Sequence, residues 1–268
     1  MAQVLAVPGH VRHGFSYVGQ FNHDFGRITG IAASIKGNIL LCDYDNKNMT
    51  LVDPLGNYLK KLDLDSEPYD VAITSQATQD ISAPTKLQIA IQNTGRDFSD
   101  KASGFLGVKE CDGTSHAVAV KHDKFDLTRL SYTGFIIGLC LVKFHAVNEK
   151  SSFSCIGGQN YIMYHETRGY TKKIDNIATL DTPTDICSDD NWAIYVSGQG
   201  SNNIHRLERY LHKEPWETSG KTAWKLLIIP LDLSHGVKEP VALCFNHEFS
   251  KLYIVNKWGK SVLVFEVI

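Results

Sequence analysis

The chain has 268 residues, 43% of them hydrophobic, and a formal net charge of −2 at pH 7. This length can bury a large core, and the near-neutral charge argues against binding to a phosphate backbone, which usually needs a basic excess. No apolar run approaches the roughly 20 residues of a membrane helix, and the first residues lack a basic secretion signal, so we expect a cytoplasmic protein.

The first predicted element is an alternating strand at 14–21, which belongs to no four-stranded unit of its own. The first unit follows at 27–64, with the strands "ITGIAAS", "ILLCD" and "NMTLVD" and a turn into "YLKKLDL". Alternation of apolar and polar residues between turns rich in Gly, Asn and Asp is typical of strands joined as hairpins. The beginning of the chain therefore predicts a small antiparallel sheet preceded by a single strand.

The opening of this unit recurs along the chain. Three copies share a proline, "EPYDVAIT" from Glu67, "TPTDICSD" from Thr182 and "EPVALCFN" from Glu239, and two weaker copies surround Ala32 and Cys140. A proline at the first residue of a strand removes no hydrogen bond from the ladder, so these positions fit strand entries. The repeats predict one strand entry per structural unit.

A second recurring segment follows each opening. "ILLCDYDNKNMTLVD", "AIYVSGQGSNNIHRLE" and "LYIVNKWGKSVLVFE" have the same loop length. Four-stranded repeats of about 40–50 residues are typical of β-propeller blades. We therefore predict an all-β propeller, a single domain over 1–268, with five blades at 27–64, 68–122, 133–175, 182–230 and 239–268. The strand at 14–21 is expected to complete the last blade and close the ring, which would otherwise leave an unpaired edge.

The segments "SNNIHRL", "EPYDVAIT" and "SKLYIVNKWGKSVLVFEV" resemble NHL-repeat propellers. They are most similar to the C-terminal domains of tripartite-motif-like proteins of molluscs and other invertebrates. The resemblance implies a target-recognition domain that selects protein or RNA, and such domains usually have six blades rather than five. Full-length members carry a RING finger, B-boxes and a coiled coil, whose zinc-binding cysteine spacing is absent from this sequence. Ubiquitin-ligase activity is therefore not expected of this chain.

Catalytic motifs are scarce in the sequence, and we expect no catalytic residue, no metal and no cofactor. Asp70 and Asp185 stand at equivalent blade entries near the predicted channel mouth. A calcium-dependent propeller hydrolase would use such carboxylates, but it needs at least four convergent oxygens. We interpret both as turn residues that accept backbone hydrogen bonds.

Loops on one face of the ring are the candidates for binding, because loops on a rigid scaffold carry most recognition residues. Trp258 is the most informative, since an indole in a polar loop flanked by glycine suits a recognition surface, although it can also fold back on its own blade. The predicted face comprises Tyr44, Asp45, Lys47, Tyr69, Asp70, Arg96, Gln199, Asn202, Lys257, Trp258 and Lys260. We expect a monomeric, non-enzymatic module for a protein partner. The alternative is single-stranded RNA, with lysines on phosphates and an aromatic ring stacked on a base.

Overall fold

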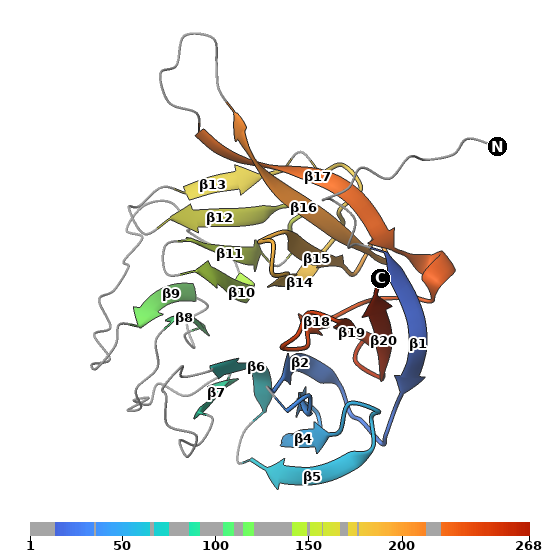
Figure 1. Ribbon diagram of the computed structural model, residues 1–268. Coiled ribbons are helices and arrows are strands. Elements are labelled where there is room, and N and C mark those ends of the chain that lie inside the picture. Colours follow the sequence, from blue (N-terminus) through green and yellow to red (C-terminus); the bar gives the residue numbers. More distant parts are fainter. Residues whose placement is uncertain are drawn as a thin grey trace, which may run out of the picture.

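The protein is built almost entirely of antiparallel strands arranged as sheets around a central axis (Figure 1). The computed structural model describes residues 14–34, 36–64, 67–74, 86–91, 104–109, 115–120, 141–148, 151–156, 158–166, 171–175, 177–212 and 221–268. Within these ranges the only helix is a three-residue 3-10 turn, η1 (Leu233–His235). The predicted all-β propeller is confirmed.

Four sheets have four strands each. One contains β2 (Ile28–Ala33), β3 (Ile39–Asp43), β4 (Asn48–Val52) and β5 (Tyr58–Asp63). Another contains β10 (Leu141–Asn148), β11 (Ser151–Ile156), β12 (Ile162–Glu166) and β13 (Thr171–Ile174). A third contains β14 (Pro183–Ser188), β15 (Ile194–Gly198), β16 (Asn203–His212) and β17 (Lys221–Leu231). The last contains β18 (Ala242–Phe245), β19 (Lys251–Asn256), β20 (Ser261–Val267) and β1 (Phe15–Phe21).

The region predicted as the second blade, 68–122, has a different arrangement. The hairpin of β6 (Pro68–Thr74) and β7 (Lys86–Ile91) forms one sheet, and that of β8 (Gly104–Lys109) and β9 (Ser115–Val120) forms another. Among the described strands each of these four pairs only with its hairpin partner, so this stretch does not give the single four-stranded unit that was predicted. The physical reason is that apolar alternation specifies strands and their faces, but not which strand pairs with which.

The ring is closed by its two ends. Strand β1 pairs with β20 over Phe15–Phe21, and Gly14 and Ile268 exchange backbone hydrogen bonds of 3.2 and 2.9 Å. Around the axis, β18 contacts β2, β2 contacts β6, and β10 contacts both β8 and β14 (Figure 1). The prediction that the N-terminal strand completes the last blade is confirmed.

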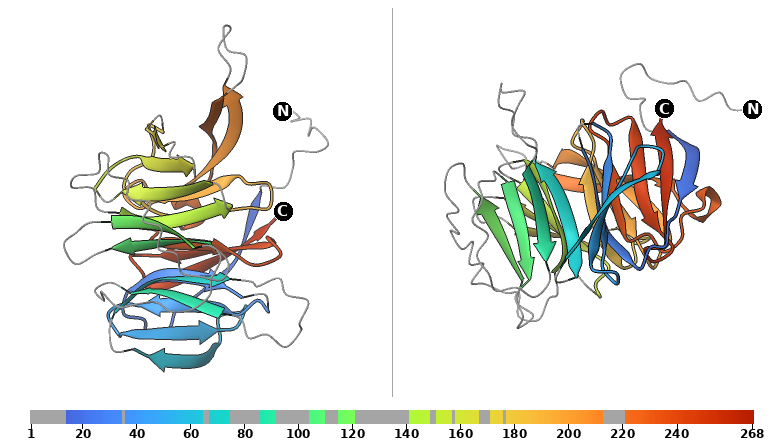
Figure 2. Two further views of the ribbon diagram at one scale, coloured as in Figure 1. Left: turned by 90° about the vertical axis from the view of Figure 1, so that its left-hand side faces the viewer. Right: turned by 90° about the horizontal axis from the view of Figure 1, so that it is seen from below.

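Burial decreases from the axis to the rim. Inner strands such as β2 and β14 are buried on both faces because a neighbouring sheet packs against each side, whereas every residue of the outer strand β5 is exposed. Seen from the side, the sheets lie against one another as successive layers (Figure 2). The hydrophobic clusters lie between neighbouring sheets, and Tyr195 and Tyr253 are among their largest fully buried side chains. A single sheet therefore has no core of its own, as expected for repeat architectures.

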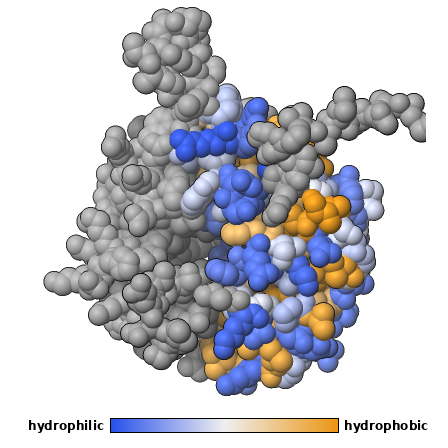
Figure 3. Space-filling model, in the orientation of Figure 1, coloured by the Kyte–Doolittle hydropathy of each residue, from blue (hydrophilic) through white to orange (hydrophobic). Residues whose placement is uncertain are grey.

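The surface of the described part is mixed in character. On the face seen in Figure 3, hydrophilic side chains predominate and hydrophobic ones are scattered between them. In the same part of the chain, no helix is long and apolar enough to cross a membrane.

Candidate functional site

One position recurs on the inner strands and brings charged side chains together near the axis. On β2, β6, β10 and β14 the pairing register shifts near the strand start, and the first residue after the shift is Gly30, Asp70, Lys143 and Asp185, respectively. These four positions are therefore structurally equivalent. On β2 this position is a glycine, because the backbone of β6 lies too close for a side chain: a Cβ on Gly30 would lie 2.8 Å from Cα of Asp70.

This register corrects the sequence alignment of the third unit. The prediction equated Cys140, which lies outside the described residues, with Cys187. Because Lys143 is equivalent to Asp185, the true equivalent of Cys187 is His145. The apolar run "IIGLCLV" imitates a strand opening better than "LVKFHAV", in which a lysine interrupts the pattern. Lys143 was missed for that reason, although two other units carry a carboxylate at the same position.

Lys143 forms a buried ion pair with Asp70. The lysine side chain is 2% exposed, and its Nζ lies 2.5 Å from Oδ1 of the aspartate, whose side chain is 29% exposed. The same oxygen accepts the backbone N–H of Val71 at 2.9 Å. Burial alone would lower the pKa of Lys143, but attraction to Asp70 and Asp185 outweighs burial and raises the pKa above its ordinary value. Lys143 is therefore a fixed ammonium ion at neutral pH.

Asp185 lies deeper in the same cluster. Its Oδ1 accepts the backbone N–H of Ile186 at 2.9 Å, and its Oδ2 accepts that of Leu243 at 2.8 Å. Burial raises the pKa of Asp185 to about 7, although the ammonium of Lys143 and the two N–H groups oppose the rise. Asp70 and Asp185 accept backbone hydrogen bonds as predicted, but they lie within strands β6 and β14 rather than in turns. Their charge interaction with a lysine was not foreseen.

The raised pKa of Asp185 links stability to pH. The folded protein keeps a proton on this carboxyl up to pH about 7, whereas an unfolded aspartate releases it near pH 4. Between these values the folded state binds more protons, so the contribution of Asp185 to stability falls as pH rises. Burial lowers the pKa of His145 and of His205 to about 4, and these two groups contribute in the opposite direction between pH 4 and 6.5.

Comparison with Asp185→Asn isolates the carboxyl, because both histidines are present in both proteins. The stability of the wild type relative to the variant is expected to fall by about 2–3 kcal/mol between pH 5 and pH 8. Urea unfolding at several pH values measures this difference. A difference independent of pH would show that Asp185 does not change its protonation over this range.

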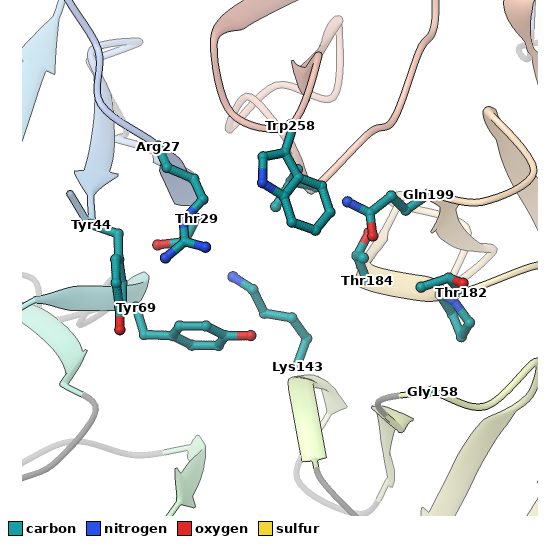
Figure 4. A pocket seen from close by; sticks show the side chains of 12 residues that line it. Arg27, Thr29, Tyr44, Tyr69, Lys143, Gly158, Thr182, Thr184, Gln199 and Trp258 are labelled. Atoms are coloured by element: carbon teal, nitrogen blue, oxygen red, sulfur yellow. The ribbon is translucent and has the colours of Figure 1, made fainter.

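The cluster lies beside a pocket of about 400 Å³. Three aromatic residues and two cations line it, namely Tyr44, Tyr69, Trp258, Arg27 and Lys143. Its other polar side chains belong to Thr29, Thr182, Thr184 and Gln199. Figure 4 shows the ammonium of Lys143, the guanidinium of Arg27 and the amide of Gln199 directed toward the middle of the pocket, with Trp258 above them. A rigid polar centre with aromatic walls suits a small molecule.

The loop that carries Trp258 is fixed by an unusual backbone. Lys257, Trp258 and Gly259 have φ of 52°, 56° and 90°, which are left-handed values. The carbonyl of Gly259 accepts the N–H of Ile28 at 3.1 Å, and a Cβ at Gly259 would lie 2.6 Å from that nitrogen. Glycine is required there, and the contact holds Trp258 over the pocket rather than folded back on its own sheet (Figure 4).

Two threonines form hydrogen bonds to the prolines of the repeats. Thr29 and Thr184 each precede an equivalent inner-strand position, and both hydroxyls donate to the carbonyl of a proline at the start of the next inner strand. The distances are 3.1 Å from Thr29 to Pro68 and 2.9 Å from Thr184 to Pro240. These contacts tie neighbouring sheets together at the rim of the pocket. Sequence reasoning missed both threonines, as well as Arg27.

Only some of the predicted binding residues line the pocket. Tyr44, Tyr69, Gln199 and Trp258 line the pocket, and Asp70 lies beside it in the ion pair with Lys143.

Four other predicted residues are not part of the pocket lining. Asp45 is 3.6 Å from Arg27, and Lys47 pairs with Glu67 at 3.0 Å. The Nζ of Lys260 donates to a backbone carbonyl of the loop before β2, and Oδ1 of Asn202 accepts the N–H of Glu239 at 2.9 Å.

Two predicted cations remain. The exposed side chain of Lys257 does not line it, and Arg96 lies outside the described residues. Among the residues that the structure describes, no group of three or more His, Cys, Asp or Glu side chains is arranged to hold a metal ion.

No protein-family description and no curated protein sequence matches the chain. Solved β-propeller structures do match it. Virginiamycin B lyase from Staphylococcus aureus aligns with 11% identity and a TM-score of 0.51, covering 95% of this chain and 100% of the lyase. A protein of unknown function from Bacteroides thetaiotaomicron aligns with 13% identity and a TM-score of 0.57, covering 96% of this chain and 72% of that protein. The PQQ-bound aldose sugar dehydrogenase from Streptomyces coelicolor aligns with 10% identity and a TM-score of 0.52, covering 95% of this chain and 98% of the dehydrogenase. These likenesses establish the fold, a β-propeller.

The comparisons correct the functional expectation. The sequence was interpreted as a non-enzymatic binding module, yet a lyase and a dehydrogenase are among the structures that match nearly the whole chain. That interpretation is wrong, because it took blade repeats, which specify the scaffold, as evidence about chemistry.

Proposed function

We propose that the chain is an enzyme that acts on a small molecule bound in the pocket, with the Lys143–Asp70 pair as its reacting centre. The observation that carries this proposal is a lysine, 2% exposed on its side chain, placed 2.5 Å from a carboxylate beside an aromatic-walled pocket. A buried charge pair is a poor source of stability, so its presence at a pocket points to a chemical role. The volume of about 400 Å³ lies in the range of small-molecule sites, roughly 300–1,000 Å³.

The protonation state of Lys143 defines the kind of chemistry. A lysine whose pKa is raised remains charged, so it does not serve as an amine nucleophile. It is suited to stabilise negative charge that develops on a substrate oxygen. Asp70 is partly exposed and can accept a proton from the carbon next to a carbonyl group.

Together these roles describe an elimination. The proton of the substrate C–H bond passes to the carboxylate of Asp70, and the electron pair of that bond moves onto the carbonyl oxygen beside Lys143. Return of the electrons forms a carbon–carbon double bond and expels a leaving group from the neighbouring carbon. This is a lyase reaction, and the lyase from Staphylococcus aureus is a protein of the same fold.

Substitution at Lys143 tests the proposal. Small carbonyl compounds with a β-leaving group, including β-acyloxy acids, are incubated with the protein and followed by mass spectrometry. We expect elimination of at least one compound, reduced about 100-fold or more by Lys143→Met, as for loss of a charge-stabilising donor. Lys257→Met, which changes a lysine outside the pocket lining, is the control. Unchanged turnover in a folded Lys143→Met protein would refute the proposal.

We also propose common ancestry with NHL-repeat propellers. Support comes from the three repeat openings: Pro68 and Pro183 are the first residues of inner strands, and Pro240 stands two residues before the inner strand β18. A sequence profile built from homologues of this chain tests the relationship. Loss of these prolines and of the adjoining apolar pattern across homologues would contradict it.

A further inference from the structure

The pocket contains hydrogen-bond donors that no described residue of the chain satisfies. Gln199 is 9% exposed, and its Nε2 has no hydrogen-bond partner within the described part of the chain. The buried Nε of Arg27 likewise makes no hydrogen bond there, although the Asp45 carboxylate lies 3.6 Å away. Leaving a buried donor without an acceptor is unfavourable, so a native site with two of them indicates an acceptor supplied from outside.

Lys143 adds donors at the same place. Its ammonium has three N–H groups, and Asp70 lies on one side of it. Figure 4 shows Nζ directed toward Arg27, with Gln199 on the opposite side of the same pocket. Side chains from three different sheets therefore converge with N–H groups, and two of them are positively charged. A planar oxyanion is the ligand group that accepts several such bonds at once.

The acids near the pocket leave this charge partly unbalanced. Asp70 neutralises one of the two cations at short range. Asp45 is half exposed and 3.6 Å from Arg27, so solvent screens that pair. Asp185 adds only part of a negative charge near neutral pH, because burial raises its pKa to about 7. The guanidinium of Arg27 therefore remains the least neutralised charge at the pocket, and it matches a ligand with a single negative charge.

The aromatic side chains that line the pocket indicate the chemical character of the rest of the ligand. The guanidinium carbon of Arg27 lies 4.4 Å from the centre of the Tyr44 ring, and this stacking holds the arginine in place. Trp258, 50% exposed, and Tyr69 provide flat apolar surfaces on the same pocket. Aromatic side chains favour flat or apolar groups that stack against them.

We propose that the ligand of this pocket is a small carboxylic acid. Its carboxylate is bound by Arg27, Lys143 and Gln199, and its flat apolar body packs against Trp258. That the acid is also the substrate rests on the proposed function. In that reaction the carboxylate is the group on which negative charge develops beside Lys143.

Calorimetric titration with matched probes tests the assignment without any turnover. The probes are 3-phenylpropionate and its neutral analogue 3-phenylpropionamide, which share the same apolar body. We expect the wild type to bind the acid at least 10-fold more tightly than the amide. Gln199→Leu is expected to weaken binding of the acid about 5-fold, and Arg27→Gln about 10-fold or more. Both variants are expected to bind the amide almost as the wild type does. Lys257→Met is the control outside the pocket lining and is expected to bind both probes as the wild type does.

The outcomes separate this inference from the proposed function. Equal affinity for acid and amide, or no binding of the acid at millimolar concentration to folded protein, would overturn the carboxylate assignment. Turnover that depends on Lys143 would leave the proposed function standing in that case. Conversely, selective binding of the acid together with Lys143-independent turnover would refute the proposed function alone. Circular dichroism of each variant excludes misfolding as the cause.

Discussion

Replacement of Asp70 and Asp185 together by asparagine is expected to lower the free energy of unfolding by about 3–5 kcal/mol at pH 7, more than the two single changes combined. The double variant leaves the ammonium of Lys143 buried, with its side chain 2% exposed and no neighbouring carboxylate in the cluster. In a protein interior an unpaired charge costs far more than a lost hydrogen bond.

Each single variant keeps one counter-charge for Lys143. When Asp70 is replaced, its repulsion of Asp185 disappears while the attraction of Lys143 remains, so Asp185 ionises more readily and takes over the pairing. When Asp185 is replaced, the contact between Lys143 and Asp70 at 2.5 Å is retained. The effects of groups within one charged network are therefore not additive.

A third substitution distinguishes the charge from the shape of the side chains. Adding Lys143→Met to the double variant removes the buried charge and keeps a side chain of similar length, so we expect it to restore most of the lost stability. Urea unfolding of the wild type, the single variants, the double variant and the triple variant completes the thermodynamic cycle. Additive single effects, or a triple variant no more stable than the double variant, would contradict the charge account.

The same cluster shows how far the sequence could be interpreted. The repeats predicted the propeller, the inner strands β2, β6, β14 and β18, and the equivalence of Asp70 and Asp185, because residue spacing within one unit is a local property. Lys143 was missed because its unit lacks the proline and has a stronger apolar run just before the true strand. Its pairing with Asp70 depends on how two sheets meet around the axis, and no local pattern specifies that.

The pocket was predicted in part for a similar reason. Tyr44, Tyr69, Gln199 and Trp258 were chosen because their loops lie on one face of any propeller, and all four line the pocket. Arg27 was not chosen because it stands outside the repeated loops, and its place depends on stacking against Tyr44 from another part of the chain. Loop position can therefore be predicted from the repeat, whereas convergence of side chains needs the closed ring.

Ring closure itself leads to a second large effect. Removal of residues 1–21 is expected to destabilise the protein by about 5 kcal/mol or more, which is comparable to the whole stability of many domains. The deletion removes β1 and exposes β20 as an unpaired edge, which favours aggregation. It also removes Phe21, which is 9% exposed, and loss of one buried phenylalanine side chain typically costs about 3–5 kcal/mol.

Phe21 matters because it connects the last sheet with the first. It lies in the hydrophobic cluster shared by β2–β4 and β19–β20, and a Cβ at Gly56 would lie only 2.6 Å from the Cβ of Phe21. Removal of residues 1–13 leaves β1 in place and is the matched control. Thermal unfolding and light scattering of the two truncated proteins measure the effect. If the protein lacking residues 1–21 unfolds at the temperature of the control and scatters light as the control does, pairing of β1 with β20 is not what closes the ring. The alignment of the pocket walls must then be maintained by the contacts between inner strands alone.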